Sequence, residues 1–311
     1  MSSILTNASA LSALQSLTQT QSALKTTENQ VSTGLAVSSA ADNASYWSIA
    51  TQLTSDSGVV TASNQALSQS QAVLSTASSA ISSITSTINS IESALTQAAN
   101  PGANLTDINT TLASLGAQLQ DAVSGASFNG LNVLDGSQSA AASGGTGDIA
   151  FVAGFNASTT GGTVNTISFT TNALIASGTG TAGAATTGTG ILEGGTGTAT
   201  GTGTNLVTLG STGNQVTAAN ATTTLAGVAT VLANLTNYAA NIGATQDRMT
   251  SASTFNSALT TNYATGVSAL VDADMNTAST RLQALQTQEQ LGIQSLSIAN
   301  QNAQLILKLF P

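Results

Sequence analysis

The side chains that could perform chemistry are few in this chain, and their spacing suits none of the common catalytic sites. The closest pair of carboxylates is Asp272 and Asp274, which are two positions apart and so point in different directions on a helix. Serine and threonine are abundant, but the chain has no histidine and no cysteine, so neither a familiar hydrolytic triad nor a thiolate metal site can form. We expect a capping or solvated role for the two aspartates, and an enzyme is the least expected class of protein.

Two glycine-rich strings have the outline of ligand-binding loops. Gly178, Gly180 and Gly183 fit the G-x-G-x-x-G pattern of dinucleotide sites, but they lie in a run of Gly-Thr alternation with no helical pattern after it. The strings Gly144–Asp148 and Gly194–Gly197 are similar to calcium-binding repeats, but they have no regular period, and only the first has an aspartate. We therefore expect no cofactor and no metal.

Charge and hydropathy exclude two classes of partner. The chain has 13 acidic and 4 basic residues, a net charge of −9, and its basic residues do not cluster: Lys25, Arg248, Arg281 and Lys308. Without a basic patch to neutralise phosphates, we expect no binding to nucleic acid. No apolar stretch approaches the roughly 18 residues that span a bilayer, so we expect no membrane partner. Aromatic residues are only 3% of the chain, which favours thin helical bundles over a large globular core.

Hydrophobic residues recur with a 3.5-residue period at both ends of the chain, which predicts helices with one apolar stripe each. Near the start the register is Ala10, Leu14, Leu17, Gln21, Leu24, Glu28, Val31 and Leu35. Near the end it is Val271, Met275, Ala278, Leu282, Leu285, Glu289, Gly292, Leu296, Ala299, Ala303, Ile306 and Phe310. Such stripes need other helices against them, so we expect the two ends to pair with each other, with other subunits, or both.

A long second helix is predicted over residues 44–99. Its apolar residues return every seven positions at Val60, Leu67, Leu74, Ile81, Ile88 and Leu95. Cap chemistry before it is available from Ser38, Ser39, Asp42 and Asn43. Pro101 and Gly102 end it, and a shorter helix follows with one face of Leu105, Ile108, Leu112, Leu115, Leu119 and Ala122. We expect Trp47 to pack where two helical segments meet rather than to stack on a ligand.

The central region predicts strands and turns. Asn129-Gly130 is a tight-turn signal, and residues 149–152 and 164–170 have the β-branched and aromatic residues of strands around a Gly161-Gly162 turn. Residues 176–215 are rich in Gly, Thr and Ala, which predicts short strands and loops in a small outer domain, or partly flexible chain. Helical period resumes near residue 217 in one stripe of Leu225, Val228, Leu232, Leu235, Ala239, Ile242, Phe255, Leu259 and Tyr263, and the last helix is expected from about Val267. The predicted fold class is mainly α with a β-rich central insertion.

Three stretches resemble the motifs of bacterial flagellin, the subunit of the flagellar filament. They are QVSTGL at residues 30–35 with SSAADNA at 38–44, FNGLNVL at 128–134, and IGATQDRM at 242–249 followed by VDADM at 271–275. Together the similar regions span roughly residues 1–135 and 225–311. The order and spacing of the motifs make the resemblance specific.

The resemblance implies a three-part filament subunit. Residues 1–43 and 266–311 would form an inner terminal coiled-coil domain, residues 44–175 and 221–265 a rod-like helical domain with a β-hairpin, and residues 176–220 a small variable outer domain. It also implies self-assembly into the extracellular flagellar filament for swimming motility, after type III export without a cleaved signal. The other partners would be an export chaperone, a filament cap and hook-junction proteins.

The candidate assembly interface consists of the larger apolar members of the two terminal registers. They are Leu14, Leu17, Leu24, Val31, Leu35, Val271, Met275, Leu282, Leu285, Leu296, Ile306 and Phe310. Their burial in a polymer is the expected driving force, with termini that are mobile in the free chain. Two other functions stay open: a hook–filament junction protein with the same terminal helices, and a secreted adhesin or glycan-binding module built on the Thr/Gly segment.

Overall fold

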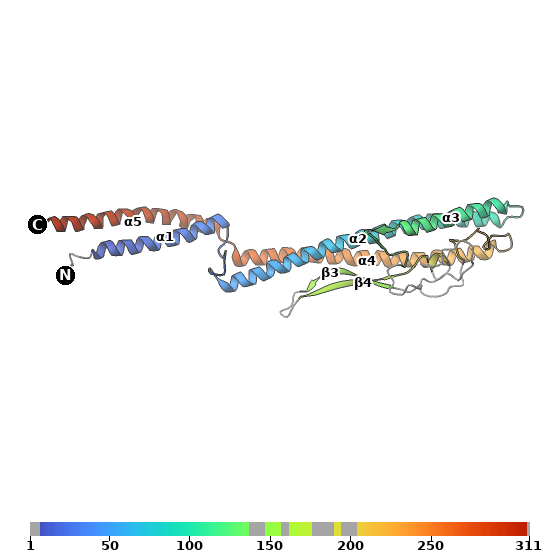
Figure 1. The fold of residues 1–311 in the computed structure, drawn as a ribbon, viewed down its shortest axis with the longest axis horizontal. Helices are drawn as coiled ribbons and strands as arrows, with labels where there is room; N and C mark the ends of the chain where they lie inside the picture. The colour runs from blue at the N-terminus through green and yellow to red at the C-terminus, as the bar shows by residue number, and fades with distance from the viewer. Residues whose placement is uncertain (1–6, 137–146, 157–161, 176–189, 194–203, 310–311) are drawn as a thin grey trace. The chain divides into compact units, whose positions relative to one another are not determined.

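The structure is a computed structural model that describes residues 7–136, 147–156, 162–175, 190–193 and 204–309, without the side chains of residues 147–148 and 302–309. Its α-helices are α1 (Ala8–Thr33), α2 (Ala44–Ala98), α3 (Leu105–Gly125), α4 (Ala221–Val271) and α5 (Met275–Leu309) (Figure 1). Its strands are β1 (Ser127–Phe128), β2 (Leu131–Asn132), β3 (Gly147–Asn156) and β4 (Thr163–Thr171), and a short 3-10 helix, η1, spans Ile191–Glu193. The predicted class, mainly α with a β-rich central insertion, is confirmed.

The chain forms two compact units. The terminal unit consists of residues 1–58 and 260–311, and the central unit consists of residues 59–259. The helices α2 and α4 contribute residues to both units. The predicted division into three domains stays a prediction.

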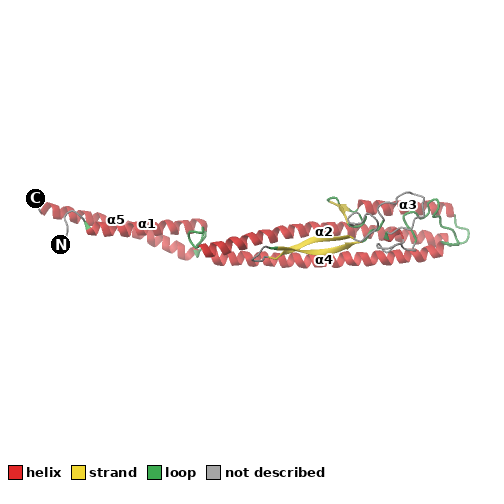
Figure 2. Ribbon diagram, turned by 60° about the horizontal axis from the view of Figure 1, so that its bottom comes forward, coloured by secondary structure: helices red, strands yellow, loops and turns green. Residues whose placement is uncertain are grey.

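The central unit is held together by apolar stripes on α2, α3 and α4, and α3 and α4 lie along α2 (Figures 1 and 2). The seven-residue repeat of α2 is buried throughout, as its period requires: Val60, Leu67, Leu74, Ile81, Ile88 and Leu95. The helix α4 adds a second buried row with the same spacing: Val228, Leu235, Ile242 and Met249. At the end of α2, Pro101 stops the helix and Gly102 takes a φ of 87°.

Two antiparallel hairpins follow α3. The first joins β1 to β2 through Asn129 and Gly130, whose φ angles of 51° and 78° are both left-handed, as a type I′ turn requires. The second pairs β3 with β4, has a bulge between Val152 and Gly154, and lies along α2 and α4 (Figure 2). The predicted turn and the two predicted strands are therefore confirmed.

Polar side chains of α4 form buried hydrogen bonds with the backbone in and beside these hairpins. Asn256 donates from Nδ2 to the carbonyl oxygen of Ala153 at 2.8 Å, at the bulge of β3. Tyr238 donates its hydroxyl to the carbonyl oxygen of Val133 at 2.7 Å, and its ring lies 5.9 Å from that of Phe169. Burial raises the pKa of the Tyr238 hydroxyl, so the group remains a donor across the physiological range.

The described parts of the Gly/Thr-rich segment also pack against this core. Their buried apolar residues are Ile191, Leu192, Leu206, Leu209 and Val216. Asn109 of α3 accepts from the Val216 N–H at 2.7 Å and donates to the Val216 carbonyl at 2.9 Å. Gly116 allows a close approach, because a Cβ there would lie 2.5 Å from the carbonyl oxygen of Val207. The loops predicted over residues 176–189 and 194–203 lie outside the described residues.

One residue of the apolar stripe predicted on α4, Phe255, does not lie on the buried face of the helix. Phe255 is 66% exposed, whereas Asn256 is buried, seven residues after Met249. The reason is periodic: the buried row continues at intervals of seven from Val228, and Phe255 lies one position off that row. The prediction that Phe255 belongs to the stripe is wrong.

The last helix also begins later than the sequence predicts. The helix α4 continues through Val267 to Val271, and α5 begins at Met275. Asp274 accepts hydrogen bonds from the N–H groups of Asn276 and Thr277, which caps α5 and fixes the break. Hydrophobic spacing continues across the break, so periodicity alone could not reveal it.

Candidate assembly interface

The two terminal helices are delimited by local cap chemistry. At the start of α1, Asn7 accepts a hydrogen bond from the Ala10 N–H at 3.1 Å through its side chain. At its end, Gly34 adopts a φ of 75° and donates its N–H to the Gln30 carbonyl at 2.9 Å. At the start of α5, the hydroxyl of Thr277, followed by its N–H and that of Asn276, stabilises the Asp274 carboxylate and holds the pKa of this group below its usual value.

The helices α1 and α5 form an antiparallel pair (Figures 1 and 2). Near one end, Asn7 donates from Nδ2 to the Ala299 carbonyl at 3.0 Å, across 292 positions of sequence. Farther along, Gln21 donates from Nε2 to Oε1 of Glu289 at 3.1 Å. Between these bonds Leu17 lies over Gly292, where an added Cβ would come within 3.1 Å of Leu17 Cδ1. The two ends of the chain therefore pair with each other, as expected.

The inner face of α5 follows the predicted register. Ala278 and Leu285 are buried, and the half-buried positions are Leu282, Glu289, Gly292, Leu296 and Ala299. All other positions from 276 to 301 are exposed. Three of the predicted interface residues, Leu282, Leu285 and Leu296, thus point toward α1.

The inner face of α1 lies partly off the predicted register. Leu17 and Leu24 are buried and Val31 is half-buried, but Leu14 is 49% exposed. The inner face of α1 also includes Ala13, Thr20 and Thr27, each one residue before the predicted Leu14, Gln21 and Glu28. The register of α1 was therefore wrong at alternate positions, because a large Leu14 gives a stronger periodic signal than the small residues that face α5.

The remaining predicted residues lie away from the pair. Val271 is buried at the last position of α4 and Leu35 is half-buried in the loop after α1, whereas Met275 is 42% exposed at the start of α5. The side chains of Ile306 and Phe310 lie outside the described residues.

The loops that connect the helices are joined by their backbones, and we call this feature the linker joint. It ties residues 34–37, after α1, to residues 271–273, before α5. Ala36 donates its N–H to the Val271 carbonyl at 2.7 Å, and Ala273 donates to the Gly34 carbonyl at 2.9 Å. Val37, Ala50 and Val271 form a small apolar cluster at the linker joint.

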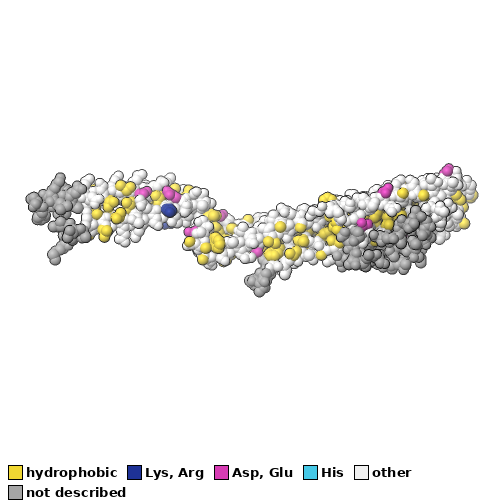
Figure 3. All heavy atoms as spheres, in the orientation of Figure 1, with side chains coloured by type: hydrophobic (Ala, Val, Ile, Leu, Met, Phe, Trp, Pro, Cys, Tyr) yellow, Lys and Arg dark blue, Asp and Glu magenta, His cyan; other side chains and the backbone are white. Residues whose placement is uncertain are grey.

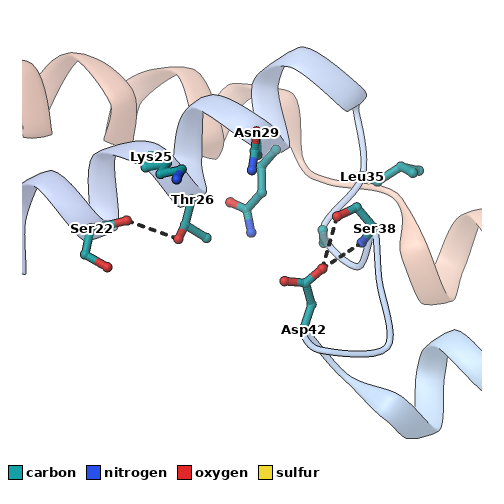
Figure 4. A pocket seen from close by; sticks show the side chains of 9 residues that line it. Ser22, Lys25, Thr26, Asn29, Leu35, Ser38 and Asp42 are labelled. Atoms are coloured by element: carbon teal, nitrogen blue, oxygen red, sulfur yellow. Dashed lines mark hydrogen bonds between the residues drawn. The ribbon is translucent and has the colours of Figure 1, made fainter.

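Asp42 holds the first of these loops in shape. Its Oδ2 accepts from the N–H and hydroxyl of Ser39 at 2.9 and 3.0 Å, and from the N–H and hydroxyl of Ser38 at 3.1 Å each. These bonds, led by the Ser39 hydroxyl, hold the pKa of Asp42 below its usual value. Figure 4 shows Asp42 beside Ser38, with Lys25 of α1 in the same pocket of about 190 Å³. Asn43 is the residue that caps α2, through bonds from the N–H groups of Ser45 and Tyr46.

The pair leaves a second set of apolar side chains outside. Leu11 is 71% exposed, and on α5 the exposed residues are Leu291, Ile293 and Ile298. Figure 3 shows hydrophobic side chains on the surface of the pair. Leu11, Leu291, Ile293 and Ile298 were not predicted from the sequence, although large apolar residues outside the heptad stripes were a usable signal. We call Leu11, Leu14, Leu291, Ile293 and Ile298 the outer apolar set.

The acidic side chains of the terminal unit have structural roles. The described residues include no cluster of three or more acidic, histidine or cysteine side chains that could hold a metal ion. None of the described helices is both long and apolar enough to cross a bilayer. Asp272 bonds to the Ser268 hydroxyl and Asp274 caps α5, so both aspartates have the capping and contact roles expected of them.

Comparison with known proteins agrees with this arrangement. Family models of the bacterial flagellin N-terminal and C-terminal helical regions match residues 4–139 and 225–310. Flagellin C of Rhizobium meliloti (strain 1021) is 38% identical over 323 residues, covering 100% of this chain and 99% of the relative. A flagellin of Brucella melitensis biotype 1 is 39% identical over 313 residues with the same coverage, and flagellin FljK of Caulobacter vibrioides is 32% identical over 313 residues, again covering 100% and 99%. The chain therefore belongs to the bacterial flagellin family.

Proposed function

We propose that this chain is the structural subunit of a bacterial flagellar filament and that it polymerises through the paired helices α1 and α5. The observation that carries the proposal is the outer apolar set, which stays exposed after the two helices have paired. Exposed leucine and isoleucine side chains on a helical pair are available for contact with other subunits. Membership of a family of structural proteins supports polymerisation rather than catalysis.

The energies suit a polymer better than an isolated dimer. Full burial of the five side chains of the outer apolar set would contribute on the order of 10 kcal/mol. Association costs roughly 4–15 kcal/mol in lost freedom before side-chain ordering is included. The net free energy of binding one neighbour is therefore close to zero. A subunit with several neighbours makes more contacts for the same loss of translational and rotational freedom.

The same balance leads us to propose that α1 and α5 become fully rigid only in the filament. Their shared core is small, with Leu17, Leu24, Ala278 and Leu285 as its buried apolar residues. Most of the stability of a helix in a protein comes from tertiary packing of its apolar face rather than from intrinsic helix propensity. Neighbouring copies would supply that packing through the interface residues predicted from the sequence and through the outer apolar set.

We also propose the cellular setting that flagellins share: type III export with a chaperone, assembly under a filament cap, attachment through hook-junction proteins, and an extracellular location. Support for these partners comes from family membership alone. The two other functions considered, a hook–filament junction protein and an adhesin, are not favoured, because relatives that match over the full chain are flagellins.

Removing α5 tests the proposal. A chain that ends at residue 274 keeps the central unit but loses half of the terminal pair. We expect cooperative unfolding by circular dichroism and no filaments by negative-stain microscopy, under conditions in which the full chain polymerises.

The matched point variant is Leu291→Ser with Ile298→Ser, which should leave the free chain folded and raise the concentration needed for polymerisation at least tenfold. Its control is Phe255→Ser, an exposed apolar residue on α4. Filaments from the truncated chain, or equal effects of the two sets of substitutions, would refute the proposal.

A further inference from the structure

The turn between β1 and β2 contains the one Asn-Gly dipeptide of this chain, Asn129-Gly130. Glycine has no Cβ, so a backbone nitrogen that belongs to glycine is the least shielded from the side chain of the residue before it. Every other asparagine of the sequence is followed by a residue that has a side chain. Both residues of the turn are exposed to solvent. The turn therefore combines an open amide side chain with an open backbone nitrogen.

The surroundings of the turn leave the two reacting groups unhindered. A Cβ added to Gly130 would meet no atom within 4 Å. Among the described residues, the side chain of Asn129 has no hydrogen-bond partner. By contrast, the buried Asn132 of the same hairpin donates to the Val123 carbonyl at 2.7 Å and accepts from the Leu134 N–H at 2.8 Å. The hairpin thus holds one asparagine side chain in place and leaves the other free to rotate.

The hairpin is short enough to open while the rest of the chain stays folded. Attack of a backbone nitrogen on the preceding side chain requires rotation about the backbone of Asn129, so the type I′ turn has to open first. The strands β1 and β2 contain two residues each, and both residues of β1 are exposed. A two-stranded hairpin of this size is marginally stable by itself, and short exposed elements open at a lower free energy than the core. The folded chain can therefore reach the reactive conformation.

We propose that Asn129 is a site of spontaneous deamidation in the folded chain. The backbone nitrogen of Gly130 forms a bond to Cγ of Asn129, its proton passes to the departing side-chain nitrogen, and ammonia leaves. Water then opens the resulting succinimide at one of its two carbonyl groups. Attack at Cγ gives aspartate, and attack at the main-chain carbonyl gives isoaspartate, in which the main chain runs through the former side chain. Either product carries a negative charge that the asparagine did not have.

The isoaspartate product alters a turn that lies next to attachments to the core. It adds a carbon atom to the main chain of the turn, whereas a two-residue hairpin turn fixes the register of its strands. Directly after β2, the Val133 carbonyl accepts from the Tyr238 hydroxyl and the Leu134 carbonyl accepts from the Leu174 N–H, each at 2.7 Å. We expect isoaspartate to displace these two acceptors and to destabilise the central unit. Aspartate is common in type I′ turns, so the other product should leave them in place.

The reaction can be followed in the full chain in heavy-oxygen water at mildly alkaline pH, with circular dichroism to show that the chain stays folded. After digestion in ordinary water, mass spectrometry should find the heavy oxygen at residue 129 before it appears at any other asparagine. The matched control is Gly130→Asn, because asparagine also accepts a positive φ and the site has room for its side chain. Its Cβ hinders the attacking nitrogen, so we expect conversion of Asn129 to be about tenfold slower.

A second measurement separates the added charge from the altered main chain. The variant Asn129→Asp has the charge alone, and its midpoint of urea denaturation should equal that of the native chain. The aged native chain, in which isoaspartate is quantified with an isoaspartyl methyltransferase, should have a lower midpoint. Conversion of Asn129 only after unfolding, or at the native rate in Gly130→Asn, overturns the proposed site. A native midpoint for the aged chain overturns the structural consequence. Neither outcome bears on the proposed function, because the reaction is measured in the free chain.

Discussion

The central unit and the terminal pair share the same seven-residue period, but they differ in how fully a single chain buries the apolar stripe. In the central unit, α2 has isoleucine or leucine at most inner positions, and its stripe is fully covered by α3 and α4. In the terminal pair, leucine alternates with alanine and threonine on the inner face of α1, and leucines remain outside. The period therefore specifies a helix and its inner face, whereas the size of the side chains decides whether one chain is enough to cover it.

The largest expected effect that tests this difference comes from creating a cavity in the core of the central unit. Ile84→Ala removes a fully buried side chain between α2 and its neighbours. We expect a loss of about 2–5 kcal/mol in the free energy of unfolding, measured by urea denaturation with circular dichroism. The control Leu14→Ala removes a half-exposed side chain and should change stability in the free chain by no more than about 0.5 kcal/mol. Similar losses for both would mean that the terminal pair is as complete as the central core.

A smaller effect should follow from removing one buried hydrogen bond in the central unit. Tyr238→Phe keeps the ring beside Phe169 but leaves the Val133 carbonyl without its donor. We expect a loss of about 1–3 kcal/mol in urea denaturation. Tyr46→Phe, on the exposed start of α2, is the matched control and should leave the midpoint unchanged. A midpoint for Tyr238→Phe equal to that of the native chain would contradict the role assigned to this bond.

The smallest expected effect concerns acid sensitivity of the terminal unit. The pKa values of Asp42 and Asp274 lie below their ordinary 3.8, because hydroxyl and N–H donors stabilise both carboxylates. The stabilisation is complete well above pH 3.8 and is lost as the pH falls through the lower folded-state pKa values. Trp47 emission followed from pH 6 downward to about pH 2 should therefore report loosening near the linker joint in acid.

The double variant Asp42→Asn with Asp274→Asn should weaken this pH dependence, and Asp121→Asn on α3 should not. An identical acid profile for the double variant and the native chain would show that other groups control the transition.

The sequence predicted the helices, the Asn129-Gly130 turn and the inner register of α5 because each has a local or periodic signal. It missed the inner positions Ala13, Thr20 and Thr27 of α1, since small residues give little periodic contrast beside Leu14. The break before Met275 was missed because hydrophobic spacing runs through it, and only cap geometry at Asp274 defines it. The pairing of two linkers 237 positions apart, such as Leu35 with Asp272, depends on tertiary contact and has no local signature.

The linker joint has a mechanical consequence. Tension applied to α5 is resisted at Ala273 and Val271 by bonds to the opposite loop, so both connections to the paired helices share the force. These bonds use peptide groups, which no side-chain substitution short of proline removes. A rotating filament therefore tolerates many side-chain substitutions at the linker joint of each subunit. The backbone hydrogen bonds that transmit torque at this joint remain.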